Sequence, residues 1–320
     1  MINQVYLPEG SLLYTAENRE YITSHTGLAR AMNEGKILES TALLCDSDLS
    51  LHVDLYGIRG IIPREEAVYC RRGEEMKDIA VITRVGKPVC FKVIDIEDRG
   101  GEPLAILSRR TAQAECIHRY LSCLCPGDIV PAKVTHLENF GAFVDIGCGV
   151  PSLLSVDSIS VSRIAHPSDR LSVGDSIHVV VRAIDRLLDR IFVSMRELLG
   201  TWEENAASFE VGQTVAGIVR SVESYGIFVE LSPNLAGLAE LREGSSDRQI
   251  ATPGSYAAVY IKNIIPEKMK VKLVLVDAYS SSASSDYRFE YFETKSHIDK
   301  FVYSPSVCDR VIMTDFADEI

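Results

Sequence analysis

The sequence lacks several features that would place it in a familiar class. Its eight cysteines form no CxxC pair and are scattered, so it is not a disulfide scaffold. No apolar run approaches the roughly 18 residues that a membrane-spanning helix needs. The start of the chain, MINQVYLPEG, has no basic segment followed by an apolar one. These absences predict a cytoplasmic protein without a membrane partner, and its 320 residues with 46% hydrophobic content allow two or three packed domains.

Catalytic signatures are also missing. The chain contains no GxxxxGK[ST], HExxH or GxSxG motif and no carboxylate spacing suited to a two-metal site. The nearest approach to a metal-binding sequence is CIHRYLSCLC (116–125). If this segment is a helix, Cys123 and Cys125 diverge around its axis, which favours cysteines packed inward over a zinc site. The sequence therefore predicts no enzyme, no cofactor and no metal.

The net charge of −12 argues at first against a nucleic-acid partner, since phosphate binding normally depends on Lys and Arg. The distribution of charge weakens that argument. Residues 36–112, 127–198 and 211–278 carry only −1, −2 and 0, so most of the acidity lies outside these three segments. A nearly neutral domain with a few clustered cations can still bind a single strand if stacking supplies much of the energy.

An internal repeat is the strongest signal. GDIVPAKVTHLENFGAFVDIG (127–147) aligns without a gap on GQTVAGIVRSVESYGIFVELS (212–232), which places Phe140 on Tyr225 and Phe143 on Phe228. In a regular strand, residues three apart point to opposite faces. The glycine between each pair indicates a bulge or a close backbone approach that turns both rings to one side. The four rings are interpreted as stacking platforms, with residues of the barrel core as the alternative.

Basic positions recur with the aromatic ones. VRAIDRLLDRIFVSM (181–195) pairs with IKNIIPEKMKVKLVL (261–275), so that Arg182 falls on Lys262 and Arg190 on Lys270. Solvated strand and loop charges are the alternative interpretation.

A weaker third copy lies upstream, in residues 40–63 and 85–110, with Leu49 and His52 in place of Phe140 and Phe143. Short strands rich in Val and Ile, separated by turn residues, predict small antiparallel barrels in each copy. The predicted fold is mainly β: three tandem five-stranded OB-fold barrels joined by short helices, with a helical N-terminal segment and a C-terminal tail. The predicted divisions are helices in 1–35, barrels in 36–112, 127–198 and 211–278, linker helices in 113–126 and 199–210, and a flexible linker with an acidic aromatic tail in 279–320.

These residues resemble the S-one RNA-binding domain family, named for the largest protein of the bacterial small ribosomal subunit. ENFGAFVDIG, SRIAHPSDRLSVGDSIHVVVRAID and RIFVSMREL carry the resemblance in the second copy. The third copy is shortened between Glu240 and Tyr256. The number of copies is similar to the short, three-domain form of that ribosomal protein.

Carried over by position, the resemblance implies an RNA face on the second and third copies. The usual histidine of the family's turn is replaced by Ser155 and Glu240, which weakens both sites. The RNA-binding residues expected from the platforms, the basic repeat and the resemblance together are Phe140, Phe143, Arg163, Arg182, Asp185, Arg190, Tyr225, Phe228, Lys262 and Lys270.

The predicted function is binding of single-stranded RNA, most directly mRNA, in translation at the small ribosomal subunit. The first copy, without the aromatic rings, is the candidate for docking to that subunit. Two alternatives remain open: a non-ribosomal regulator of RNA stability or transcription, and an adaptor whose OB barrels bind protein.

Overall fold

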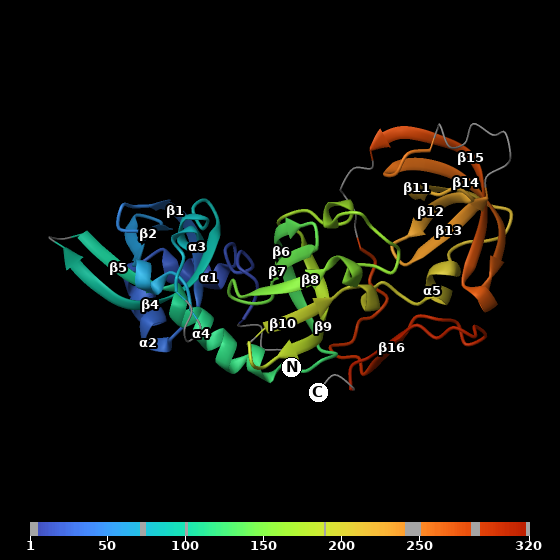
Figure 1. Cartoon of the computed structure of the whole chain (residues 1–320). Coiled ribbons are helices and arrows are strands. Elements are labelled where there is room, and N and C mark those ends of the chain that lie inside the picture. Colours follow the sequence, from blue (N-terminus) through green and yellow to red (C-terminus); the bar gives the residue numbers. More distant parts are fainter. Residues whose placement is uncertain are drawn as a thin grey trace. The chain divides into compact units, whose positions relative to one another are not determined.

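The computed structural model describes residues 6–70, 75–99, 102–188, 190–240, 251–282 and 289–317. Its main elements are three closed five-stranded barrels, drawn in blue to cyan, green to yellow and yellow to orange in Figure 1. The predicted mainly β fold with three tandem OB barrels is confirmed. In the described ranges, no helix is long and apolar enough to cross a membrane.

The first barrel follows two short helices, α1 (Ala16–Ile22) and α2 (His25–Glu34). Its strands are β1 (Leu38–Cys45), β2 (Leu51–Leu55), β3 (Ile58–Ile62), β4 (Pro88–Arg99) and β5 (Glu102–Ser108). The short helix α3 (Asp78–Ile82) lies between β3 and β4. The linker helix α4 (Arg109–Arg119) begins directly after β5, inside the range predicted for the barrel.

The second and third barrels repeat this order. The second contains β6 (Ile129–Glu138), β7 (Gly141–Asp145), β8 (Pro151–Ser155), β9 (Ser176–Asp185) and β10 (Arg190–Ser194). The third contains β11 (Thr214–Val222), β12 (Gly226–Ser232), β13 (Leu235–Glu240), β14 (Ser255–Ile265) and β15 (Lys270–Ser282). In each barrel the third and fifth strands pair in parallel. The other neighbouring strands of the first and third barrels pair antiparallel, as do β9 and β10 of the second.

Helix α5 (Trp202–Ala206) precedes the third barrel. Thr201 caps it, and the side chain of Glu204 accepts from the Thr201 backbone amide, so the two residues form a capping box. Trp202 is 3% exposed and packs in the core of the third barrel, so it anchors the helix there.

For the segment after the third barrel, the sequence predicts a flexible linker and an acidic aromatic tail and leaves the folding of that tail open. Residues 279–282 form the end of β15, and residues 283–288 lie outside the described residues. Beyond them, β16 (Lys300–Val302) and β17 (Met313–Asp315) pair antiparallel as a small hairpin, red in Figure 1. Phe316 is buried with Ile129, Val180 and Leu198 of the second repeat. The tail is therefore packed structure, because its aromatic residues find partners far away in the sequence.

The chain divides into two compact units. One contains residues 1–124, 131–133 and 145–151, and the other contains residues 125–130, 134–144 and 152–320.

The first unit holds a buried group of acids. The Glu9 carboxylate accepts hydrogen bonds from Arg109 Nε at 2.7 Å and from the Cys90 amide at 3.0 Å. The Glu9 amide in turn donates to Asp145 Oδ2 at 2.7 Å. Glu39, which is 1% exposed, accepts from the backbone amides of Gly10 and Leu12 at 2.9 Å. One N-terminal loop is thus fixed by three acidic side chains that are distant in the sequence.

These acids titrate differently. Burial raises the pKa of Glu39 to about 8, opposed by the amide hydrogen bond from Leu12 and assisted by the charge of Glu9. Burial, followed by the charge of Glu9, raises the pKa of Asp145 to about 7. Burial alone would also raise the pKa of Glu9, but the charge and hydrogen bonds of Arg109 leave it below the ordinary value.

Stability of this unit should therefore fall as pH rises. A carboxyl group whose pKa is raised by folding stabilises the protein below its unfolded pKa, and that contribution is lost as pH rises through the folded value. For Glu39 and Asp145, this window runs from their ordinary pKa values up to about 8 and about 7. We expect the free energy of unfolding to drop by about 2 kcal/mol or more between about pH 5 and pH 9.

The Glu39→Gln variant, which resembles the protonated acid, should show a smaller drop. Urea unfolding of both proteins across this pH range measures the difference. Parallel pH profiles would contradict the assigned protonation of Glu39. The Glu20→Gln change, at an acid whose side chain is 64% exposed, is the control.

In the second unit, a buried ion pair connects two barrels. Arg170, in the crossover between β8 and β9, forms a two-pronged ion pair with Glu230 of β12, and both side chains are at most 1% exposed. Arg220 Nε also donates to Glu230 Oε2 at 2.7 Å. A buried carboxylate needs such partners because desolvation of the charge is costly.

Asn234 is a second point of connection in this unit. Its buried amide side chain accepts a hydrogen bond from the Val161 amide at 3.0 Å and donates to the carbonyls of Arg196 and Gly200 at 2.8 Å. The backbone carbonyl of Asn234 accepts a hydrogen bond from Tyr303 Oη at 2.6 Å. One residue in the β12–β13 turn thereby bonds to the crossover, the linker and the tail.

Candidate nucleic-acid interface

The two predicted aromatic pairs have the same geometry. The rings of Phe140 and Phe143 lie edge to face, with centroids 6.1 Å apart and planes at 89°, and the values for Tyr225 and Phe228 are identical. Phe140 is 55% exposed and Tyr225 is 60% exposed, while Phe143 and Phe228 are half-buried. Core residues would be covered, so the exposure favours the platform interpretation. One ring of the pair is thus accessible to solvent in both the second and the third barrel.

The local backbone explains how residues three apart come together. Phe140 and Tyr225 lie in the turns that precede β7 and β12, so each pair has one ring in a turn and the other in a strand. A Cβ on Gly141 would lie 2.4 Å from the Leu154 carbonyl oxygen, and one on Gly226 would lie 2.8 Å from that of Ala239. Glycine is required here because the neighbouring strand passes too close for a side chain.

Arg182 and Lys262 lie at equivalent β-bulges, one in the second barrel and one in the third. The pairing of β9 with β10 shifts between Phe192 and Val193, which skips Arg182, and the pairing of β14 with β15 skips Lys262 in the same way. Bulges re-aim a side chain out of the ladder. Lys262 is exposed, whereas Arg182 is half-buried and donates to Ser158 Oγ at 3.1 Å. The cation is therefore positioned equivalently in both barrels but is more constrained in the second.

Asp185 and Arg190 face each other across the end of the β9–β10 hairpin. The Asp185 carboxylate accepts from the amides of Leu187 and Leu188 at 3.0 Å, so this acid also fixes the turn. In the third barrel, Lys270 takes the place of Arg190 and faces Ile265. Both basic residues are exposed.

The remaining predicted positions are in the crossover and the adjoining turn. Arg163 is exposed in the second barrel's crossover. His166 accepts from the Ser168 amide and caps the turn 167–169, which is a structural role. Ser155 pairs its hydroxyl with that of Ser158 at 2.8 Å.

Strand pairing reveals two residues that sequence reasoning missed. In the third barrel, Phe228 pairs with Leu238, which pairs with Lys272, and this row faces outward between buried neighbours. Lys272 forms an exposed ion pair with Glu240 at 3.2 Å. In the second barrel, the position of Lys272 is held by half-buried Phe192, which pairs with Leu153. Phe192 lies two residues after exposed Arg190, so strand alternation alone could have placed it on the outer face.

The first barrel lacks the RNA-binding face that is predicted for the second and third barrels. His52 occupies the position of Phe228, as predicted, since it pairs with Leu44 as Phe228 pairs with Ser221. Its ring lies 2.9 Å from Asp46, and this hydrogen bond lowers the pKa of Asp46. At the bulge, Ile94 replaces the basic residue and is 44% exposed. The first barrel keeps the frame but presents no aromatic pair and no cation at these positions.

The cysteine segment differs from the prediction in one respect. Cys116 is buried on α4, as expected, but Cys123 and Cys125 lie beyond the helix and are exposed. The expectation that the helix packs all these cysteines inward is therefore wrong. Among the residues that the structure describes, no three His, Cys, Asp or Glu side chains are grouped as metal ligands.

Comparison with known proteins supports the class that the barrels indicate. Residues 125–196 match the model of the S1 RNA binding domain. The chain is 29% identical over 234 residues to small ribosomal subunit protein bS1 of Rhizobium meliloti, covering 70% of this chain and 40% of that protein. It is 31% identical over 233 residues to bS1 of Leuconostoc lactis, covering 70% and 52%. The chain spans about half the length of these relatives.

A multidomain protein with nucleic acid binding domains from Streptococcus pneumoniae also aligns, with 16% identity, a TM-score of 0.24 and coverage of 75% and 73%. The barrels and the match at 125–196 place the chain among tandem OB-fold proteins that contain an S1 domain. The predicted relation to the bacterial ribosomal protein S-one family is confirmed.

Proposed function

We propose that the protein binds single-stranded RNA, in particular mRNA, through its second and third barrels and acts in translation at the small ribosomal subunit. The observation that carries this proposal is the repeated aromatic pair, which has the same spacing and orientation in both barrels. The S1 match over the second barrel and the bS1 relatives support it. The protein would act in the cytoplasm by binding, without catalysing a reaction.

The proposed mechanism depends on stacking more than on charge. A base stacked on an aromatic ring contributes about 1 to 3 kcal/mol, and it does so for every base because each has a π-face. Arg190 and Lys270 would hold phosphates near the end of the last hairpin of each barrel. The Arg170–Glu230 pair connects the second repeat to the third barrel, so a strand bound by one barrel meets the other at a high effective concentration.

We propose that the first barrel docks to the small ribosomal subunit. It has His52, whose ring is hydrogen-bonded to Asp46, and Ile94 where the third barrel has Phe228 and Lys262, so it lacks the phenyl ring and the lysine proposed to bind RNA there. This division of labour would leave both aromatic barrels available for mRNA.

Titration with salt tests RNA binding directly. We expect a fluorescent oligouridylate to bind the full chain, with a log–log slope of about −0.7 for each phosphate neutralised. The small number of cations on the two faces predicts a shallow slope of about −2 to −4 by the same rule. A protein adaptor would give no binding to titrate.

Co-sedimentation with isolated small ribosomal subunits, in the presence of excess competitor RNA, tests the proposed location. Binding that survives the competitor supports docking through protein. If the chain binds RNA but stays at the top of the gradient, the function is that of a non-ribosomal RNA regulator.

A further inference from the structure

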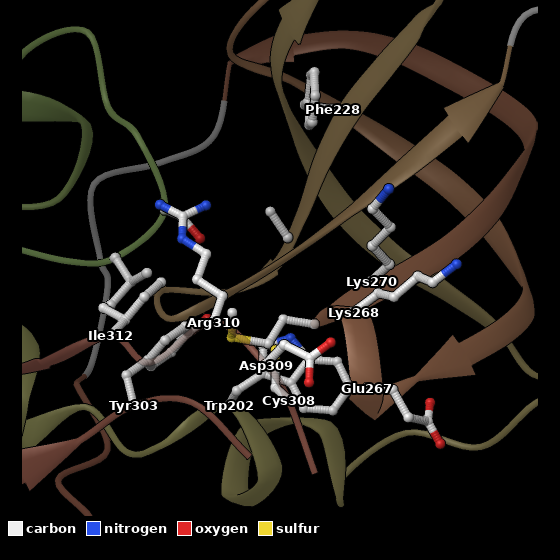
Figure 2. Close-up of a pocket in the computed structure, with 14 residues that line it drawn as sticks. Trp202, Phe228, Glu267, Lys268, Lys270, Tyr303, Cys308, Asp309, Arg310 and Ile312 are labelled. Carbon is white, nitrogen blue, oxygen red and sulfur yellow. The ribbon is translucent and has the colours of Figure 1, made fainter. Parts of the chain in front are cut away.

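A hollow of about 480 Å³ lies beside the aromatic pair of the third barrel (Figure 2). Its lining residues are distant in the sequence: Val161 and Ser162 of the crossover, Trp202, Phe228 and Ala236, residues 267–270, and Tyr303, Cys308, Asp309, Arg310 and Ile312 of the tail. Predicted RNA-binding residues Phe228 and Lys270 are thus part of its wall. The tail forms one wall of the hollow, which the third barrel alone does not provide.

The tail is held firmly at this place. The loop between β16 and β17 closes through a hydrogen bond from the Tyr303 amide to the Ile312 carbonyl at 2.9 Å. Tyr303 is bonded at both ends, since its hydroxyl reaches Asn234 and its carbonyl accepts from the Trp202 amide at 3.0 Å. At the base of the hairpin, Thr314 Oγ1 donates to Glu197 Oε1 at 2.8 Å. The loop that carries Arg310 is therefore anchored beside the third barrel.

The walls of the hollow combine positive charge with an aromatic ring. Figure 2 shows Arg310 rising from the tail on one side, Lys268 and Lys270 extending from the barrel on the other, and Phe228 above. Within the described part of the chain, these three cations make no ion pair. Two carboxylates, Glu267 and Asp309, share the lining, so one net positive charge remains. This arrangement suits an anion attached to a flat, stackable group.

We propose that this hollow is a nucleotide subsite, in which the tail completes the RNA face of the third barrel and Arg310 contacts a phosphate. The inference depends on the proposed RNA-binding function and extends it beyond the barrel. A base stacks on Phe228, and the phosphate joined to it lies between Arg310 and Lys270. The volume is within the range of small-ligand sites, which is about 300 to 1,000 Å³.

The subsite also compensates for a weakness of the third barrel. Its crossover is shortened in the sequence between Glu240 and Tyr256, and Glu240 stands where the resembling family usually has a histidine. The tail hairpin brings a guanidinium to the same face from residue 310. A planar guanidinium can hold two phosphate oxygens at once, which makes Arg310 a stronger contact than a lysine would be.

Affinity measurements on the full chain test this contact. The Arg310→Ala variant should bind the oligouridylate about fivefold or more weakly, in line with loss of a charged hydrogen bond. Its salt slope should be smaller by about 0.7. Lys295→Ala is the matched control because it removes the same charge from an exposed tail residue outside the hollow. Arg310→Lys should recover part of the affinity.

Cys308 offers a second readout that locates the RNA. This half-buried thiol lines the hollow, whereas Cys123 is exposed elsewhere. Saturating oligouridylate should slow alkylation of Cys308 by iodoacetamide at least about threefold and leave that of Cys123 unchanged. Mass spectrometry of the two peptides measures both rates in one sample.

The outcomes separate the subsite from the proposed function. If the unaltered protein binds RNA, but Arg310→Ala behaves like Lys295→Ala and Cys308 is not protected, the subsite is wrong and the barrels alone bind RNA. If the unaltered protein does not bind RNA, the proposed function fails and the subsite fails with it.

Discussion

Replacing Phe140 and Phe143 together by alanine should weaken binding of single-stranded RNA by about 30-fold or more. Each stacked ring contributes about 1 to 3 kcal/mol, so the loss of both removes at least about 2 kcal/mol. Because Phe140 is 55% exposed and lies in a turn, its removal should leave the barrel folded. Fluorescence anisotropy with the full chain measures the affinity, and circular dichroism checks the fold.

The third barrel provides the matched comparison. Tyr225→Ala with Phe228→Ala removes rings of identical geometry, so the two double variants should have effects of similar size if both barrels hold RNA. Tyr14→Ala is the control for loss of an exposed aromatic side chain, since Tyr14 is 78% exposed in the N-terminal segment. A folded Phe140→Ala, Phe143→Ala protein with unchanged affinity would refute the platform.

Breaking the buried ion pair should have the largest effect on stability. We expect Glu230→Gln to lower the free energy of unfolding of the second unit by about 3 to 5 kcal/mol, because it leaves the buried guanidinium of Arg170 without its counter-charge. Arg220 loses its ion pair with Glu230 as well, although it keeps Asp169 Oδ2 at 3.8 Å. Urea unfolding followed by Trp202 fluorescence reports on this unit, since Trp202 lies in its core.

Arg170→Met should cost less than Glu230→Gln. In that variant Glu230 keeps Arg220, whose Nε lies 2.7 Å from Glu230 Oε2, so the remaining buried charge is still paired. Glu20→Gln breaks an exposed pair with Arg30 and should change stability by less than about 1 kcal/mol. Equal losses for all three variants would show that burial does not set the strength of the Arg170–Glu230 pair.

The repeat made most of the fold predictable. Strand order, the aromatic pairs and the basic positions recur at nearly constant spacing, so one local pattern read several times predicted three barrels. The alignment of Phe140 on Tyr225 also predicted equivalent aromatic pairs in two barrels. The repeat did not single out Phe192, because Lys272 stands at its position in the third barrel and the aromatic residue therefore does not recur.

Long-range partners account for what the sequence did not reveal. Arg170 and Glu230 are 60 residues apart and resemble ordinary surface charges in the sequence. The tail has no periodic pattern, and the burial of Tyr303 and Phe316 depends on surfaces that exist only after the barrels have formed. For the same reason, Arg310 could not be assigned to the RNA face from its neighbours in the chain.

The hydrogen bonds of Asn234 affect how cooperatively this protein unfolds. Its side chain and carbonyl together connect the second barrel's crossover, the linker before α5 and the tail. If one of these segments detaches, polar groups of the others lose buried partners, which is unfavourable. The repeats of the second unit should therefore unfold in one cooperative transition. The repeat pattern suggests two independent domains, but cutting the chain between residues 198 and 211 would yield two incompletely folded fragments.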